Sequence, residues 1–270
     1  MEGRRGLREG GLSLLLGAEA HLDEFGVVAF HHDLAELLPW SDQDLRAVAA
    51  QIPRRWLDAY GAHGTSTSNA VSPLEALERV EAAGGVVRLE HLELVPGYRR
   101  RVEEIVHEAA AMFTPSEAVT RHTSVVYVGA GTSRAPWHFD LHHNLFVHLA
   151  GTKRFMVGRM TEPRSQHHLV VRRLSGALGP VPELDQVKLF ELRLGDALYI
   201  PPFTFHSIEN LDTTVSVACS WSTPASMRAV RLQHMNGRLG RLGLRTRAPG
   251  RRRSTEAAKL ALDRLIGFVR

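Results

Sequence analysis

The stretch Pro136-Trp-His-Phe-Asp-Leu-His-His-Asn144 contains a histidine and an aspartate two residues apart, His138 and Asp140. On an extended strand both side chains leave the same face, so the pair can contact one metal ion. A third ligand is offered by His206, which lies 66 residues beyond Asp140 in Gly195-Asp-Ala-Leu-Tyr-Ile-Pro-Pro-Phe-Thr-Phe-His206. There a Gly-Asp turn, a short apolar strand and two prolines precede the histidine. The pattern predicts that folding brings His206 to the pair on a separate strand, near the mouth of a barrel.

This ligand set indicates which metal the site would hold. Two imidazoles and one carboxylate bind Fe(II) on one face and leave the opposite face open for a co-substrate and oxygen. The same three ligands also suit Zn(II). A His-x-Asp tripeptide alone is weak evidence, because the chain contains 15 histidines and 29 acidic residues. The flanking segments therefore decide between a metal site and a chance pairing.

Four segments between residues 120 and 222 resemble those of a known family. They are Tyr127-Val-Gly-Ala-Gly-Thr-Ser133, Pro136-Trp-His-Phe-Asp140, Asn144-Leu-Phe146 with Gly151-Thr-Lys-Arg-Phe155, and Gly195-Asp-Ala-Leu-Tyr-Ile-Pro-Pro202 followed by His206. Together these segments resemble the JmjC branch of the cupin-like, 2-oxoglutarate-dependent oxygenases. The resemblance implies that His138, Asp140 and His206 hold Fe(II).

The resemblance also implies a site for the co-substrate. Lys153 occupies the position of the lysine that binds the distal carboxylate of 2-oxoglutarate, and Asn144 matches the amide beside the metal. A lysine buried in a narrow barrel forms a strong hydrogen bond with such a carboxylate, and its burial without one would be costly. Tyr127, Ser216 and Ser220 are further candidates for this cofactor site. The candidates for the substrate pocket are Trp137, His142, Phe146 and His148.

Two departures from the family pattern concern the co-substrate. Ala135 stands where many relatives carry a hydroxyl residue, three positions before the first metal histidine. The late strand Val215–Trp221 lacks the inward asparagine of some members, and offers serine or alanine instead. If the strand stays regular, Asn144, Phe146 and His148 share a face with His138 and Asp140; a bulge would undo that inference.

The implied activity is that of an Fe(II)- and 2-oxoglutarate-dependent dioxygenase. Such a hydroxylase uses O2 to insert one oxygen atom into a C–H bond, with succinate and CO2 as co-products. Its substrate would be a protein or peptide side chain, or an amino-acid-like small molecule. No residue beyond the metal ligands is assigned a catalytic role. Two alternatives remain open: a metal-dependent cupin enzyme that does not use 2-oxoglutarate, and a non-catalytic binding module.

The expected fold is mainly β with added helices, an α+β protein built on a double-stranded β-helix (jelly-roll or cupin) barrel. We divide the chain into an N-terminal mixed region at 1–118, a catalytic core at 119–223 and a basic helical extension at 224–270. Helices are predicted after the capping residues Ser41 and Ser72, over 97–112, and over 254–269. The predicted strands are 124–128, 145–149, 154–157, 188–192, 197–200 and 215–221. We interpret 63–69 as a flexible loop and 161–185 as an irregular insertion that faces the substrate.

Charge is concentrated in the C-terminal tail. Residues 224–270 contain 12 Lys and Arg against 2 Asp and Glu, whereas the whole chain carries a net charge of +4. Such a cluster is typical of phosphate binding, but the tail has only one aromatic residue, so we do not favour nucleic acid as a partner. By resemblance, part of this region would form a homodimer through its helices.

The composition indicates a cytoplasmic protein. The single cysteine, Cys219, excludes an internal disulfide framework and fits a reducing compartment. No apolar run is long enough to span a bilayer, so no membrane partner is expected. The pairs His31-His32 and His167-His168 have no spacing that indicates a site, and we interpret both as surface or loop residues.

Overall fold

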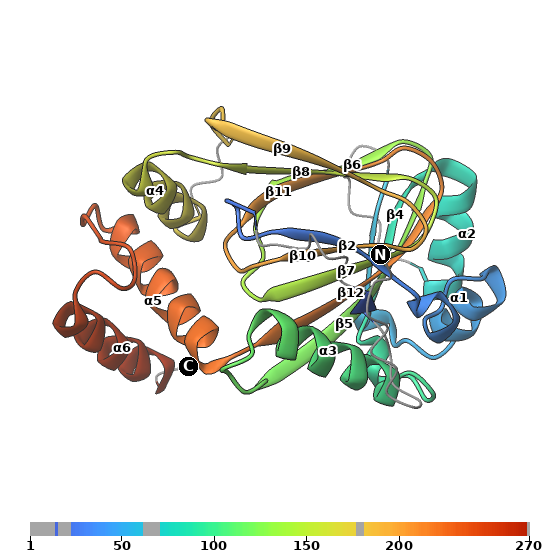
Figure 1. Ribbon diagram of the computed structural model, residues 1–270, viewed down its shortest axis with the longest axis horizontal. Coiled ribbons are helices and arrows are strands. Elements are labelled where there is room, and N and C mark those ends of the chain that lie inside the picture. The colour runs from blue at the N-terminus through green and yellow to red at the C-terminus, as the bar shows by residue number, and fades with distance from the viewer. Residues whose placement is uncertain (1–13, 16–22, 62–70, 177–180, 269–270) are drawn as a thin grey trace, which may run out of the picture.

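The computed structural model describes the chain except for residues 1–13, 16–22, 62–70, 177–180 and 269–270. Within the described residues the strands form two antiparallel sheets that face each other (Figure 1). The larger sheet has the order β1-β2-β10-β7-β12-β5-β4-β3, and the smaller has the order β6-β11-β8-β9. The predicted α+β class, with a two-sheet core and helices at both ends of the chain, is confirmed.

All six predicted strands are present, and each is longer than the sequence pattern indicated. The strands are β1 Leu14–Leu15, β2 Val28–His32, β3 Leu57–Tyr60, β4 Gly85–Glu90, β5 Arg121–Ala130, β6 Ser133–His138, β7 His143–Ala150, β8 Lys153–Arg159, β9 Gln186–Leu192, β10 Asp196–Ile200, β11 Phe205–Asn210 and β12 Thr214–Ser222. β2, β3 and β4 come from the N-terminal region and extend the larger sheet on both sides.

Alternation along the strands separates the interior between the sheets from the outer surfaces. On β7, Phe146 faces the interior, where it packs with Phe155 of β8 and Ala218 of β12. The neighbouring Leu145 and Val147 belong instead to the core on the outer side of the larger sheet. Because side chains on a strand alternate between its faces, the even-numbered residues 144–148 of β7 and 216–220 of β12 line the interior.

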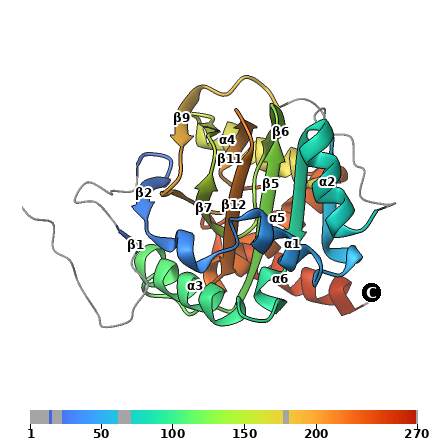
Figure 2. The same cartoon turned by 90° about the vertical axis from the view of Figure 1, so that its right-hand side faces the viewer.

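Helices from the N-terminal region cover the outer side of the larger sheet (Figures 1 and 2). They are α1 Asp42–Ala49, α2 Pro73–Ala83 and α3 Arg99–Phe113, with the short 3-10 helices η1 Leu34–Leu37, η2 Arg54–Trp56 and η3 Leu92–Leu94. Ser41 and Asp44 form a capping box at α1, and Ser72 caps α2 with proline at its first position. These caps satisfy backbone N–H groups that the first helical turn leaves unpaired, as predicted.

A second group of helices stands at the other end of the molecule, as Figure 1 shows. It consists of α4 Pro163–Leu174, α5 Pro224–Arg241 and α6 Arg253–Phe268. The prediction of an irregular 161–185 segment was therefore wrong in its first half. Glu162 accepts a hydrogen bond from the Ser165 amide and caps α4. Pro163 at the first helical position was thus the start signal of a helix.

α6 is held on α5 mainly by polar contacts. Arg228 contacts Glu256 at 2.6 Å, Arg231 contacts Asp263 at 2.8 Å, and Lys259 donates to Asn236 Oδ1. Leu265, on the predicted apolar stripe of α6, is 67% exposed.

Two further expectations have a structural outcome. His32 is buried, contrary to the interpretation of His31-His32 as surface or loop residues, and its Nε2 lies 3.0 Å from the His148 carbonyl oxygen. His31 is exposed as expected. The predicted loop at 63–69 lies outside the described residues. Over the part of the chain that the structure describes, no helix has the length and apolar character to cross a membrane.

Candidate metal centre

Backbone pairing brings two of the three predicted metal ligands together. His138 ends β6, His206 lies near the start of β11, and the two are directly paired across the antiparallel strands. Asp140 lies in the loop beyond β6 rather than on the strand, so the expected same-face geometry of a continuous strand was wrong. The Phe203 amide donates to the Asp140 carbonyl at 2.9 Å and fixes this loop beside the turn that leads into β11.

The three side chains converge. Their ligand atoms all lie within 4.8 Å of one another, and Nε2 of His206 is 3.8 Å from Oδ2 of Asp140. That separation exceeds a hydrogen bond, for which about 3 Å is typical, and leaves space for an ion between the two atoms. The sequence-predicted triad of His138, Asp140 and His206 is therefore brought together in an arrangement that could hold a metal ion.

Both histidines present the ring nitrogen that a metal requires. Nδ1 of His138 donates to the Pro136 carbonyl at 2.8 Å, and Nδ1 of His206 donates to the Thr204 carbonyl at 2.9 Å. Because Nδ1 carries the proton, the lone pair is on Nε2, the usual arrangement of metal-binding histidines. Burial, followed by the neighbouring His138, lowers the pKa of His206, so its ring is neutral near pH 7.

Asn144 completes the immediate surroundings of the triad. Its Nδ2 donates to Oδ2 of Asp140 at 3.0 Å and orients the carboxylate. Its Oδ1 is buried and has no hydrogen-bond partner within the described residues. A buried acceptor without a donor costs about 1–3 kcal/mol. The unpaired oxygen of Asn144 beside the triad fits a donor that arrives with a ligand, such as water bound to a metal ion.

The interior between the sheets leads from the triad to Lys153. On β8, Val157 pairs with His206. Lys153 lies four residues before Val157 on the same face, so about 13 Å of strand separates the two positions. Phe155 lies between them, with its ring 6.2 Å from that of His206 and 4.8 Å from that of Phe146. Nζ of Lys153 is 4.8 Å from the Phe146 ring centre. Aromatic side chains thus lie between the triad and the lysine.

Lys153 is a buried lysine that no carboxylate contacts among the described residues. Its side chain is 3% exposed, and Nζ donates to Oγ of Ser216 at 2.9 Å. The ring of Tyr127 is 5.9 Å away, and no charged group among the described residues raises the pKa of Lys153. Burial lowers the pKa of Lys153 from 10.5 to about 7. The lysine is therefore poised to bind an anion that enters the interior.

The remaining predicted residues lie in several places. Ser220 pairs with Asn144 at the metal end, and Ser216 pairs with His148 at the lysine end. Nδ1 of His142, in the loop after Asp140, is 2.8 Å from Oγ of Ser222. Trp137 packs in a different cluster, with Leu169 and Val170 of α4. The roles of these residues stay predictions.

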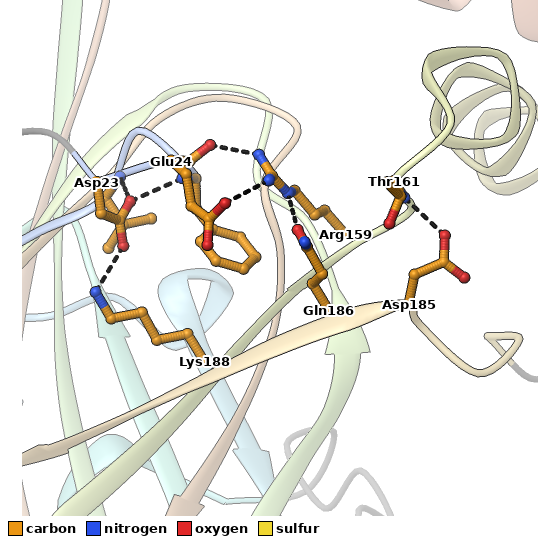
Figure 3. A network of polar contacts seen from close by, with 9 residues as sticks. Asp23, Glu24, Arg159, Thr161, Asp185, Gln186 and Lys188 are labelled. Atoms are coloured by element: carbon orange, nitrogen blue, oxygen red, sulfur yellow. Dashed lines mark hydrogen bonds and ion pairs between the residues drawn. The ribbon is translucent and has the colours of Figure 1, made fainter.

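Sequence reasoning missed the polar contacts that hold segment 23–26 at the mouth of the barrel (Figure 3). Lys188 of β9 donates to Asp23 at 3.0 Å, and Arg159 of β8 donates to Glu24 at 2.7 Å and to Gln186 at 2.6 Å. Oδ1 of Asp23 also accepts from the amides of Phe25 and Val27. Aspartate three residues before glycine was the available turn signal, but nothing in the sequence indicated the partners.

A hollow of about 370 Å³ lies at this mouth. It is lined in part by Phe25 and Arg159, and by Phe203 and Thr204, which precede the metal ligand His206. Phe203 has a φ of +64°, a conformation that is unusual for a bulky residue and often marks a functional site. The hollow therefore shares a loop with the metal centre.

Comparison with known proteins agrees with this geometry. Residues 96–227 match the family model of the cupin-like domain, which spans the strands of both sheets from β5 to β12 and the whole triad. No curated protein matches the chain at a significant level. The matched region thus contains a cupin-like domain with a His-Asp-His triad that could hold a metal ion.

Proposed function

We propose that this protein is an Fe(II)- and 2-oxoglutarate-dependent hydroxylase. It inserts one oxygen atom into a C–H bond of a protein or peptide side chain, or of an amino-acid-like small molecule. The observation that carries the proposal is the unpaired ammonium of Lys153, which faces the same interior as the triad. A metal site alone would fit many reactions, but a metal site joined to a buried cation fits a chelating organic acid.

The triad supplies the ligands for the metal. Nε2 of His138, Nε2 of His206 and a carboxylate oxygen of Asp140 would hold Fe(II), since two imidazoles and a carboxylate on one face leave the remaining positions open. When bound, Fe(II) and 2-oxoglutarate would activate O2, of which one oxygen atom enters the substrate C–H bond and the other enters succinate, with CO2 as the second co-product. The chain's own contribution is to orient the carboxylate through Asn144 and to hold Nδ1 of both imidazoles on backbone carbonyls, so that Nε2 faces the metal position.

Lys153 supports 2-oxoglutarate over other organic ligands. A buried ammonium needs a charged or strongly polar partner, because its transfer from water into an apolar interior is costly. One serine hydroxyl and two aromatic rings compensate only part of that cost. A carboxylate at Nζ would form a charge-assisted hydrogen bond and raise the pKa of Lys153 again. A dicarboxylate that reaches from the triad to Nζ meets both requirements.

The decisive experiment is an anaerobic titration with Fe(II) and 2-oxoglutarate, followed by the visible charge-transfer band of the chelate. Wild type should develop the band and should release succinate in air even without substrate. Lys153→Met should lower the affinity for 2-oxoglutarate at least tenfold and leave the affinity for Fe(II) unchanged. The matched control is Lys259→Met, which removes a lysine of α6 that donates to Asn236 of α5, and it should bind Fe(II) and 2-oxoglutarate like wild type. Absence of both the band and succinate from wild type would refute the proposal.

A further inference from the structure

A chain of three hydrogen bonds lies behind the Lys153 ammonium. The imidazole of His148 is fully buried on β7, with Nε2 at 2.8 Å from the Gly151 carbonyl oxygen and Nδ1 at 2.9 Å from Oγ of Ser216. The same Oγ accepts from Nζ of Lys153 at 2.9 Å. The three polar side chains therefore form one connected network from the backbone at Gly151 to the ammonium.

Chemistry fixes the direction of every bond in this network. A carbonyl oxygen can only accept, so Nε2 of His148 must carry a proton. Burial and the charge of Lys153 lower the pKa of His148 to about 4, so the ring is neutral and Nδ1 is an acceptor. The Ser216 hydroxyl must then donate to Nδ1, and its oxygen lone pair faces the ammonium.

This direction decides what Ser216 can do. The Ser216 hydroxyl donates its proton to His148, so it does not donate to an anion at Lys153. Its oxygen accepts a hydrogen bond from one of the three N–H groups of Lys153, and the other two can donate to a ligand. Hydrogen bonds in such a chain also strengthen one another, because each donor polarises the next.

We propose that His148 is a positioning residue for the distal carboxylate of 2-oxoglutarate, acting through Ser216 on the Lys153 ammonium. The inference rests on the proposed function and adds to it His148, which contacts neither the metal ligands nor Lys153 directly. It also means that Ser216 hydrogen-bonds to the lysine and does not donate to the anion.

Paired substitutions at His148 test the direction of the network. His148→Asn keeps an acceptor near the position of Nδ1, whereas His148→Gln keeps the donor to Gly151 and loses that acceptor. In the glutamine variant the Ser216 proton has no acceptor behind it and turns into the barrel, toward the ammonium. We expect 2-oxoglutarate affinity within about twofold of wild type for His148→Asn, and about tenfold weaker for His148→Gln and Ser216→Ala, the size of a hydrogen bond to a charged group.

The readout is the dissociation constant of 2-oxoglutarate at saturating Fe(II) under anaerobic conditions, compared with that of 2-oxobutyrate. 2-Oxobutyrate can chelate the metal but has no distal carboxylate, so its affinity should not change in any of these variants. Ser124→Ala is the matched control: it removes a buried serine that donates to Glu93 at 2.6 Å, outside the interior. It should affect stability alone.

The outcomes separate the two proposals. If wild type does not bind 2-oxoglutarate, the proposed function fails and this inference fails with it. If wild type binds and Ser216→Ala is unchanged, or the asparagine and glutamine variants behave alike, the positioning role is refuted while the function stands. Parallel weakening of 2-oxobutyrate would also refute it, because that pattern indicates a general distortion of the site. If the His148 variants fail to fold, the affinity of Ser216→Ala for 2-oxoglutarate is the test: a tenfold loss supports the network and an unchanged affinity refutes it.

Discussion

Replacing Lys153 by methionine should make the ligand-free protein more stable. Methionine has a similar length and no charge, so the variant removes the cost of keeping an ammonium in an apolar interior. The pKa of Lys153 falls from 10.5 to about 7 on folding, and each pKa unit corresponds to about 1.4 kcal/mol. Below pH 7 the wild-type lysine therefore destabilises the fold by about 5 kcal/mol. Loss of the bond to Ser216 offsets about 1–2 kcal/mol of the gain, which leaves about 3 kcal/mol.

The pH dependence of this gain identifies its cause. A lysine whose pKa is lower in the folded than in the unfolded state makes wild type more stable as pH rises from 7 to 10.5, because the unfolded chain then binds the extra proton. The advantage of Lys153→Met should be full below pH 7 and should fade toward pH 10.5. The titratable groups that face Nζ are His148 and Tyr127. His148 is neutral throughout this range, since its pKa is about 4, and burial raises the pKa of Tyr127.

The assay is urea unfolding of metal-free wild type and variant at pH 6.5, 8 and 9.5, with thermal melting as a second measure. A gain of about 3 kcal/mol corresponds to a rise in Tm of about 6 °C or more in a chain of this size. Mn(II) alone should stabilise both proteins, because the metal ligands are unchanged. Adding 2-oxoglutarate at saturating Mn(II) should stabilise wild type further and the variant much less, since a ligand raises stability only as far as it binds the native state. A variant that is less stable than wild type at pH 6.5, or a difference that does not change with pH, would refute the reasoning.

Three further predictions concern other parts of the molecule. Asp140→Ala should abolish Fe(II) retention, measured by elemental analysis, with an unchanged circular dichroism spectrum, because Asp140 lies in a half-exposed loop; retained metal would contradict the assigned ligand set. Arg159→Met should lower the free energy of unfolding by about 1 kcal/mol and speed hydrogen exchange at the Phe25 amide, since the arginine contacts Glu24 and stacks on Phe25. Unchanged exchange would show that Arg159 does not hold segment 23–26 in place. Cys219 should resist a thiol reagent at pH 8 until the protein unfolds, because burial raises its pKa to about 12; rapid labelling of the native protein would disprove this.

The metal ligands could be predicted from sequence because each depends on a local signal. His138 and Asp140 are two residues apart, and the turn and prolines before His206 indicate a strand start. The reason given for the pair was nevertheless incomplete. Asp140 reaches the site from a loop that the Phe203 amide fixes, and β6 and β7 lie in different sheets. The condition of one regular strand from His138 to His148 is therefore not met, although Asn144 still reaches Asp140 and Phe146 still faces the interior.

The network behind Lys153 could not be predicted, because it depends on strands that are far apart in sequence. Ser216 pairs with His148 in a regular register, so both side chains point into the interior. The register then shifts between Val215 and Ser216, and Gly151 turns the chain with a φ of +73°. The turn brings the Gly151 carbonyl back to Nε2 of His148, three residues earlier. A Cβ at Gly151 would collide with the Thr213 backbone, so the glycine that precedes Lys153 in the sequence motif is also what allows the backbone to fix the His148 tautomer.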